Sequence, residues 1–256
     1  FRSGTPCIRV TKVNNISSLP EFIRFVDGYP AIEIGHTKIA IGDLHVGYEL
    51  AAKENGIHIP NMLPRYKERI SSIAKLSDAK ELYILGDFKN SIITPSIEES
   101  QELFKLVYFM KEKFTVTLIP GNHDALLDKI LADDIKFAPA SGIVLEEHGK
   151  KIALLHGHAK PSKMVREADI IVMAHFHFFI KYDNAKYPIW LIGKMGEKTL
   201  ILMPPFNDLL PGFPVNDFNM QIPYFKATVA DLEAVTLDGY NLGKVGKLGK
   251  VEAEFD

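Results

Sequence analysis

Five short apolar runs, each ending abruptly in side chains suited to metal binding or proton transfer, restrict the fold of this sequence more than any other feature. The runs and their endings read KIAIGDLH, ELYILGD, TVTLIPGNHD, KIALLHGH and DIIVMAHFH. Short continuous runs rich in β-branched residues are typical of strands buried on both faces. The polar residues at their ends are Asp43 and His45, Asp87, Asn122 with His123 and Asp124, His156, and His175 with His177.

Helical periodicity fills several of the gaps between these runs. In the segment SIEESQELFKLVYFMKEKF, five apolar residues follow the i, i+3, i+4, i+7 spacing of one helix face. They are Leu103, Leu106, Val107, Met110 and Phe114. Further helices are predicted after Pro64 and after Asn122. Alternating strands and helices indicate α/β layers with a largely parallel sheet. Ligands of such sheets gather beyond the carboxyl ends of the strands, so we expect the five polar endings to converge.

The sequence changes character after His177. One hairpin is predicted with its turn near Gly196-Glu197, and a second at Asp238-Gly239, a strong two-residue turn signal. The segment between them, MPPFNDLLPGFPVNDFNMQIP, contains five prolines and predicts a long structured loop. Such a loop is either functional or a cover over a sheet edge.

The polar endings extend from Asp43 to His177, so no cut within that span leaves a complete site. We therefore expect one domain over residues 1–256, with residues 1–20 as a loose N-terminal extension. Lys and Arg number 30 against 32 Asp and Glu, for a net charge of −2. This balance argues against a general nucleic-acid coat protein, but not against a nuclease, because bound metal ions supply local positive charge.

Cysteine usage and hydropathy bear on location. Cys7 is the single cysteine, so no disulfide can form within the chain and a reducing compartment fits. No apolar run approaches the ~18 residues of a membrane span, and the first ten residues lack the apolar core of a signal peptide. We expect a cytoplasmic protein with no membrane association.

Each polar ending is a weak signal alone, because Asp and Asn after a strand are more often turn or cap residues. Jointly they form a mixed ligand set of carboxylates, imidazoles and one amide, without thiolate. This set excludes a structural zinc finger and suits Mn, Fe, Zn or similar divalent ions. Seven ligands are too many for one tetrahedral ion, but they suffice for two if one carboxylate bridges. Two adjacent ions can activate the oxygens of an in-line phosphoryl displacement.

The order of these motifs resembles the calcineurin-like metallophosphoesterase superfamily. The resemblance covers residues 31 to 177 and rests on Asp43-x-His45, Gly86-Asp87, Gly121-Asn122-His123-Asp124, His156-Gly157 and His175-x-His177. Within it, GDLHVGYE and PPFNDLLPGFPVN look like the SbcD-related, ICC-like phosphoesterase branch. The resemblance implies a layered α/β sandwich of two mixed β-sheets flanked by helices, with the metal site at the strand carboxyl ends.

The resemblance also implies residue roles. The first ion would be held by Asp43, His45 and His177, the second by Asn122, His156 and His175, and Asp87 would bridge both. Manganese is the first expectation for the two divalent ions, with Fe, Zn or Ni as alternatives. An activated hydroxide would attack phosphorus in line. His123 would stabilise the transition state or protonate the leaving oxygen, and Asp124 would orient His123.

Four features depart from the family pattern or remain open. Ala174 stands where the last motif usually has Gly, and Ala tolerates fewer backbone conformations. Asn90 stands where His or Asp is common, and it is either a substrate contact or a turn residue. His158 is either a substrate or supporting group or a surface histidine. Phe176 and Phe178 flank the last ligands and are expected to pack in the core.

The leading hypothesis is a two-metal phosphodiesterase acting on DNA, RNA or a nucleotide. The diester preference rests on the branch resemblance. A phosphomonoesterase with the same site is one alternative, and a weakly catalytic metal-binding scaffold for protein assembly is another. A nuclease of this size and charge is expected to rely on a protein partner or on homo-oligomerisation, or to act on short ends.

Overall fold

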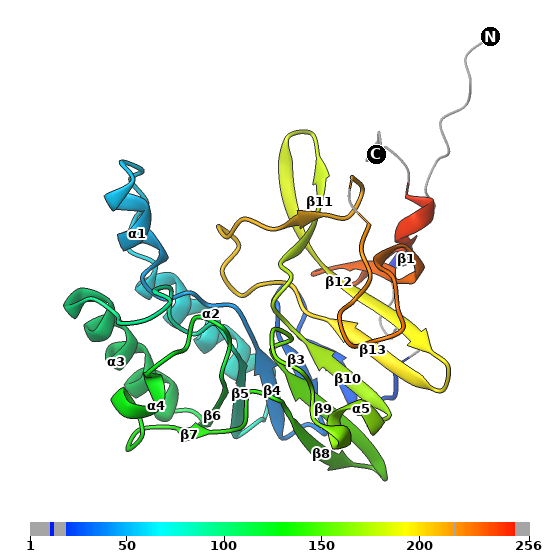
Figure 1. Ribbon diagram of the computed structural model, residues 1–256, viewed down its shortest axis with the longest axis horizontal. Coiled ribbons are helices and arrows are strands. Elements are labelled where there is room, and N and C mark those ends of the chain that lie inside the picture. The colour runs from blue at the N-terminus through cyan, green and yellow to red at the C-terminus, as the bar shows by residue number, and fades with distance from the viewer. Residues whose placement is uncertain (1–10, 13–18, 218, 249–256) are drawn as a thin grey trace.

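The computed structural model describes residues 11–12, 19–217 and 219–248. The expected N-terminal extension over residues 1–20 lies largely outside this range, as does Cys7. Within the described part, two β-sheets pack face to face, and Figure 1 shows most of the helices gathered on the outer side of one of them. None of the described helices is long and apolar enough to cross a membrane.

Within the described part of the chain, the smaller sheet has six strands in the order β2-β3-β4-β5-β6-β7. Their bounds are β2 Ile23–Phe25, β3 Ile32–Ile34, β4 Lys38–Ile41, β5 Glu81–Leu85, β6 Thr115–Ile119 and β7 Lys136–Phe137. The pairs β4–β5, β5–β6 and β6–β7 are parallel, whereas β2 and β3 add an antiparallel edge. The first three predicted runs are therefore the neighbouring strands β4, β5 and β6, and their carboxyl ends lie side by side.

The larger sheet has ten strands among the described residues, ordered β1-β16-β15-β12-β13-β10-β9-β8, with β11 and β14 joined to it through β12. Their bounds are β1 Thr11–Lys12, β8 Ile143–Glu147, β9 Lys150–Leu155, β10 Ile170–Met173, β11 Phe178–Tyr182, β12 Ala185–Met195, β13 Lys198–Leu202, β14 Phe213–Pro214, β15 Glu233–Thr236 and β16 Tyr240–Lys244. Strands β9, β10 and β13 are parallel to one another. Both predicted hairpins are confirmed as β12–β13 and β15–β16.

The helices are short apart from two. Their bounds are α1 Tyr48–Glu54, α2 Leu63–Leu76, α3 Ile97–Lys111, α4 Leu127–Ile130 and α5 Lys163–Glu167, with 3₁₀ turns η1 Val229–Asp231 and η2 Val245–Lys247. The helix α3 begins at Ser96, whose side chain caps it by accepting a hydrogen bond from the Glu99 N–H, and α2 carries Pro64 in its first turn. The helix predicted after Asn122 is a single turn, α4, because the residues before it form the site loop.

Apolar side chains alternate between the faces of the central strands. On β5, Leu82 and Ile84 pack against the helices, while Tyr83 and Leu85 face the second sheet. On β10, Ile170 and Val172 lie in the layer between the sheets. This period of two, with both faces covered, explains why the runs read as continuously apolar.

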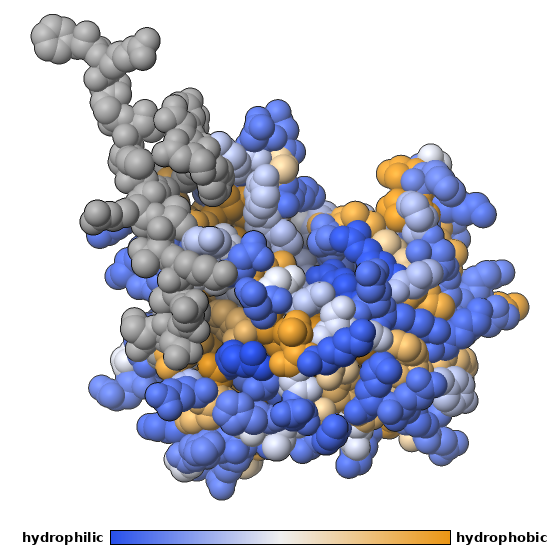
Figure 2. Space-filling view, turned by 180° about the vertical axis from the view of Figure 1, so that it is seen from behind, coloured by the Kyte–Doolittle hydropathy of each residue, from blue (hydrophilic) through white to orange (hydrophobic). Residues whose placement is uncertain are grey.

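The layered sandwich of two mixed β-sheets that the family resemblance implies is confirmed, whereas the single, largely parallel sheet indicated by the alternation of strands and helices is wrong. The five predicted strands belong to two mixed sheets, three to the smaller and two to the larger. Their carboxyl ends still meet, because the sheets pack against each other through a shared apolar layer. Figure 2 shows the rear face as mostly hydrophilic, with a hydrophilic hollow beside the end of the molecule that carries α1.

The segment between the two hairpins is a structured loop, as predicted. Its Phe206 and Asn207 are fully buried. The Phe206 N–H donates to Gly42 O at 2.8 Å and the Asn207 N–H donates to Asp43 O at 3.1 Å. The loop is thus fastened to the residues that follow β4, next to the predicted ligands.

Candidate metal centre

The structure brings the seven predicted ligands together from five loops. Asp43 and His45 follow β4, Asp87 follows β5, Asn122 follows β6, His156 follows β9, and His175 and His177 follow β10. In the described residues, three groups of side chains have ligand atoms within 4.8 Å of one another: Asp43 with His45 and His177, His45 with Asp87 and His123, and Asp87 with His156 and His175. Strands from both sheets contribute to the first and third groups.

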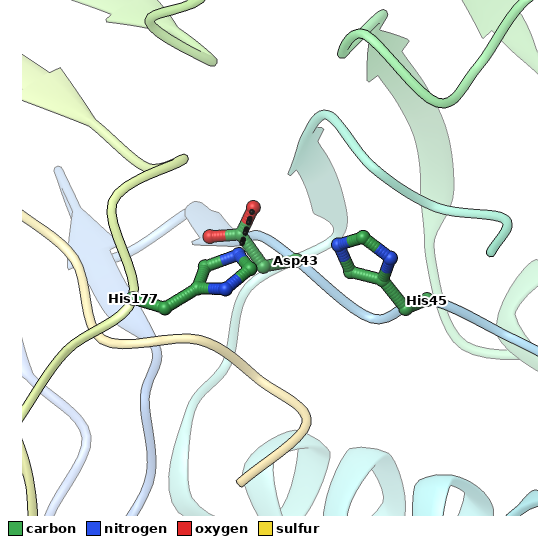
Figure 3. Close-up of side chains that lie close together, drawn as sticks. All are labelled: Asp43, His45 and His177. Atoms are coloured by element: carbon green, nitrogen blue, oxygen red, sulfur yellow. Dashed lines mark ion pairs between the residues drawn. The ribbon is translucent and has the colours of Figure 1, made fainter. Parts of the chain in front are cut away.

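The first group consists of Asp43, His45 and His177, whose side chains point toward one common space in Figure 3. Asp43 Oδ1 and His177 Nε2 lie 3.3 Å apart. These two atoms and His45 Nε2 are buried and have no hydrogen-bond partner among the described residues. Buried polar atoms are costly without a partner, so the convergence of three of them fits a cation at this position.

The second group consists of Asp87, His156 and His175, joined by Asn122. His156 Nε2 lies 3.3 Å from Asp87 Oδ2, 3.2 Å from Asn122 Oδ1 and 3.0 Å from His175 Nδ1. Asp87 and Asn122 present oxygen atoms here, which only accept hydrogen bonds. A proton or a metal ion among these atoms removes their mutual repulsion, so this donor set also fits a divalent cation.

Backbone carbonyls set the proton positions on two of the histidines. His156 Nδ1 donates to Leu85 O at 2.8 Å, and His177 Nδ1 donates to Pro211 O at 3.0 Å. Because a carbonyl only accepts, each Nδ1 carries a hydrogen and each Nε2 is the nitrogen that faces the site. Metal-binding histidines commonly have this arrangement, which fixes the ring and its tautomer.

The charges of the site stabilise one another. Burial alone would raise the pKa of Asp43 and Asp87, but the neighbouring histidines outweigh it and lower both pKa values, that of Asp87 strongly. Burial would lower the pKa of His156, yet Asp87 and Asp43 raise it to about 9. Burial and the nearby His156 lower the pKa of His175 to about 4. Asp87 is ionised at neutral pH and lies between the two groups, where a bridging ligand is expected.

Backbone strain is concentrated at the site. Eleven non-glycine residues have positive φ among the described residues, and five of them are predicted ligands. They are Asp43 (56°), His45 (47°), Asp87 (48°), His175 (81°) and His177 (49°). Such residues cost ~1–3 kcal/mol each and persist where function requires their geometry. His175 and His177 consequently lie on a tight loop between β10 and β11.

His123 faces the same space, but its orienting partner differs from the prediction. One of its ring nitrogens lies within 4.8 Å of ligand atoms of His45 and Asp87, and its Nδ1 contacts Asn90 O. Asp124 is buried and accepts hydrogen bonds from the Gly121 and Phe88 N–H groups at 2.7 and 2.8 Å. The Asp124 carboxylate therefore shapes the loop, and the Asn90 carbonyl orients the ring.

His158 and Asn122 line a cleft beside the second group. The cleft has a volume of about 590 Å³, and its lining includes Leu126, Phe137 and Asp128. The His158 ring lies 5.3 Å from the His156 ring, and burial together with His156 lowers the pKa of His158. The side chain of Asn90 is partly exposed at the edge of the site loop.

Ala174 fits the site without strain. It is absent from the residues with positive φ, is buried, and donates its N–H to His156 O at 3.0 Å. Phe176 and Phe178 are buried and stack on each other, as expected for core residues. A Cβ on Gly42 would approach the Ala174 Cβ to 2.8 Å, so the close packing needs a glycine on the facing loop.

Two supporting residues were missed by the sequence analysis. Lys89 is fully buried, and its Nζ donates to the His123 and Ser91 carbonyls. Glu99 is 5% exposed and accepts the N–H groups of Asn90 and Ser91. The apolar periodicity of α3 includes no signal for Glu99, because its role depends on a loop eight to nine residues earlier.

Comparison with known proteins gives one family match and solved structures of similar fold. The sequence matches the calcineurin-like phosphoesterase family over residues 37–195, more than half of the chain. The crystal structure of the Pseudomonas putida nuclease MPE is similar, with a TM-score of 0.55 and 18% identity over 85% of this chain and 98% of that chain. The E. coli phosphoesterase YfcE gives a TM-score of 0.40 and 16% identity over 76% of this chain and 98% of its own.

An archaeal phosphodiesterase gives a TM-score of 0.38 and 17% identity over 68% of this chain and 87% of its own. No curated protein matches the sequence. At these identities, the likeness to the nuclease shows a shared fold and leaves the substrate open. With the family match, the layered fold and the converging ligands in agreement, the chain belongs to the calcineurin-like phosphoesterase family.

Proposed function

We propose that this protein is a phosphodiesterase that uses two divalent metal ions, manganese first among the candidates, to hydrolyse a nucleic-acid or nucleotide diester in the cytoplasm. The observation that carries the proposal is the position of Asp87 between two groups of convergent ligands, with His123 facing the same space. The first ion is assigned to Asp43, His45 and His177, and the second to Asn122, His156 and His175. Asp87 is assigned to both.

A pair of divalent ions, when bound, supplies Lewis acidity at the phosphorus and lowers the pKa of water. The residues of the chain then do the remaining work. The two carboxylates and four imidazoles fix the positions of the charges, and His123 is available to protonate the leaving oxygen. The burial of Asp43 and His156 keeps water away from the ligands and strengthens each electrostatic contact.

The cleft beside Asn122 and His158 favours a diester over a monoester. A diester carries a second ester group that needs room next to the phosphorus, and the cleft adjoins the second ligand group. Among the described residues that line the cleft there is no lysine or arginine, and Asp128 lies at its wall. An uncharged ester group such as a nucleoside therefore suits it better than a further phosphate.

The test is hydrolysis of bis-p-nitrophenyl phosphate by protein stripped with a chelator. We expect no turnover until Mn²⁺ is restored, and stoichiometric metal content when activity returns. A faster rate with p-nitrophenyl phosphate would identify a monoesterase instead. Tight metal binding without turnover under any divalent ion would identify a scaffold, although a scaffold gives no reason to retain His123 in the site.

Phe137 gives a sharper test of the cleft. Phe137→Ala is expected to raise KM about tenfold for a nucleoside p-nitrophenyl phosphate, which corresponds to ~1.4 kcal/mol of lost contact. The KM for methyl p-nitrophenyl phosphate should stay unchanged, since a methyl group does not reach across the cleft. Equal effects on both substrates would contradict the assignment of the cleft to the ester group.

A further inference from the structure

The orientation of His123 depends on a single backbone carbonyl. His123 Nδ1 lies 2.5 Å from Asn90 O. Because a carbonyl oxygen only accepts, Nδ1 must carry a hydrogen, and Nε2 is the nitrogen left to exchange a proton with a substrate. A displacement of the Asn90 carbonyl would change both the orientation of the His123 ring and its tautomer.

The Asn90 carbonyl is held in place by a carboxylate on α3. Glu99 Oε1 accepts the Asn90 N–H and the Ser91 N–H, each at 2.9 Å. Glu99 lies in the first turn of α3, and its own N–H donates to the capping Ser96 side chain at 3.1 Å. Hydrogen bonds to a charged acceptor are stronger than neutral ones, so the buried carboxylate clamps this turn to a helix of fifteen residues.

A buried ammonium group ties the same turn to the loop of His123. Lys89 is fully buried, and its Nζ donates to Ser91 O on one side and His123 O on the other. Among the described residues, no carboxylate oxygen lies within ion-pair distance of this Nζ. A buried charge is costly, and the contacts that compensate Lys89 are backbone carbonyls of the two segments around His123.

We infer that Glu99 and Lys89 are positioning residues for His123, an inference that rests on the proposed function. They hold residues 89–91 so that Asn90 O keeps the hydrogen on Nδ1 and Nε2 faces the leaving group. In the reaction, an attacking hydroxide forms a new P–O bond while the P–O bond on the opposite side breaks, and the electron pair of the broken bond passes to the leaving oxygen. The Nε2 proton of the imidazolium passes to that oxygen, and neutral imidazole with its hydrogen on Nδ1 remains.

The test compares Glu99→Ala with Glu99→Gln, which keeps an acceptor oxygen for both N–H groups. Glu102→Ala is the matched control, because Glu102 is a buried carboxylate on the same helix that contacts Asn61 instead of residues 89–91. For Glu99→Ala we expect kcat to fall on the order of 10²-fold, with KM and metal content unchanged. Glu99→Gln should recover most of the rate, and Glu102→Ala should keep it.

The dependence of the rate on the leaving group distinguishes a misplaced general acid from a general structural defect. The loss in Glu99→Ala should be larger for a diester with an alkoxide leaving group than for p-nitrophenolate, which departs without a proton. Lys89→Met should show the same pattern, with a larger loss of rate for the alkoxide leaving group. A uniform loss across leaving groups, or a loss of metal, would overturn the inference.

A measurement that needs no activity addresses the tautomer directly. In metal-free protein labelled with ¹⁵N-histidine, two-bond ¹⁵N–¹H correlations should show neutral His123 with its hydrogen on Nδ1. The His123→Ala spectrum assigns the signal, and Glu99→Ala should shift it toward the Nε2–H form. Hydrogen on Nε2 in the unaltered protein would overturn the inference, whereas an inactive protein with the expected tautomer would contradict only the proposed function.

Discussion

At the scale of single residues, the loss of His123 should affect turnover without affecting metal binding, unlike the loss of an assigned ligand. We expect His123→Ala to keep both metal ions and to lose turnover by ~10²–10⁴-fold, the usual contribution of a proton-transfer group. Elemental analysis checks the metal content, and steady-state kinetics on the same preparation checks the turnover. His36→Ala serves as the control, because His36 is an exposed turn residue.

The opposite outcome for His123 has a structural meaning. His123 has a nitrogen within 4.8 Å of ligand atoms of His45 and Asp87. If His123→Ala loses one metal ion, His123 is itself a ligand, and the assignment of roles within the site is wrong.

Asp87 should be the residue whose loss affects metal binding most. Its Oδ2 lies 3.4 Å from His45 Nε2 and 3.3 Å from His156 Nε2, so one carboxylate serves both groups. We expect Asp87→Ala to empty at least one site, measured as metal equivalents per chain. Asp128→Ala, which removes an exposed carboxylate from the cleft wall, should leave the stoichiometry unchanged. Full occupancy in Asp87→Ala would contradict the bridge.

At the scale of elements, the loop after β6 depends on a glycine that cannot carry a side chain. A Cβ on Gly121 would come within 2.2 Å of Asp87 Oδ1 and 2.4 Å of Asp87 N. We expect Gly121→Ala to displace Asp87, to destabilise the protein by ~1–3 kcal/mol and to lower metal content. Gly149→Ala is the control, because Gly149 has φ +73° in open space and should lose stability without losing metal.

The elements also show which local signals suffice for prediction. The strands β4, β5, β6, β9 and β10 and both hairpins follow from apolar runs and turn residues, because these signals are local. The helix after Asn122 was overestimated, since periodicity in residues 124–134 does not reveal that the site loop uses the first of them. The positive φ values of His175 and His177 have no local signal in the sequence, since the loop that carries them also contacts residues such as Asp43, which is distant in the chain.

At the scale of the whole molecule, the partition of the strands into two sheets was beyond the reach of local signals from the residues. The runs before Asp87 and before His156 are both continuously apolar, yet they form strands of different sheets. The sheet of each strand is decided by its pairing partners. For example, β10 pairs in parallel with β13, which belongs to a hairpin later in the chain. The motif order nevertheless predicted the convergence of the ligands, because strand carboxyl ends are where such sites form. The partner of His123 was missed, since it is a backbone carbonyl.

The joining of the two sheets leads to a prediction about stability. Asp43, His45 and Asp87 come from the smaller sheet, whereas His156, His175 and His177 come from the larger. Each assigned ion would therefore link the sheets and satisfy acceptors such as Asp43 Oδ1 that otherwise lack partners. A ligand that binds only the folded state at a hundred times its Kd adds ~2.7 kcal/mol of stability.

Chelation should accordingly lower the Tm of the whole protein, and Mn²⁺ should restore it in a concentration-dependent way. The increment should shrink in Asp87→Ala, which removes the shared ligand, and persist in His123→Ala, which is assigned no metal. Scanning calorimetry of the three proteins with and without Mn²⁺ measures this directly. An identical Tm in stripped and reloaded protein would mean that the ions, if bound, lie on one sheet alone and do not hold the sheets together.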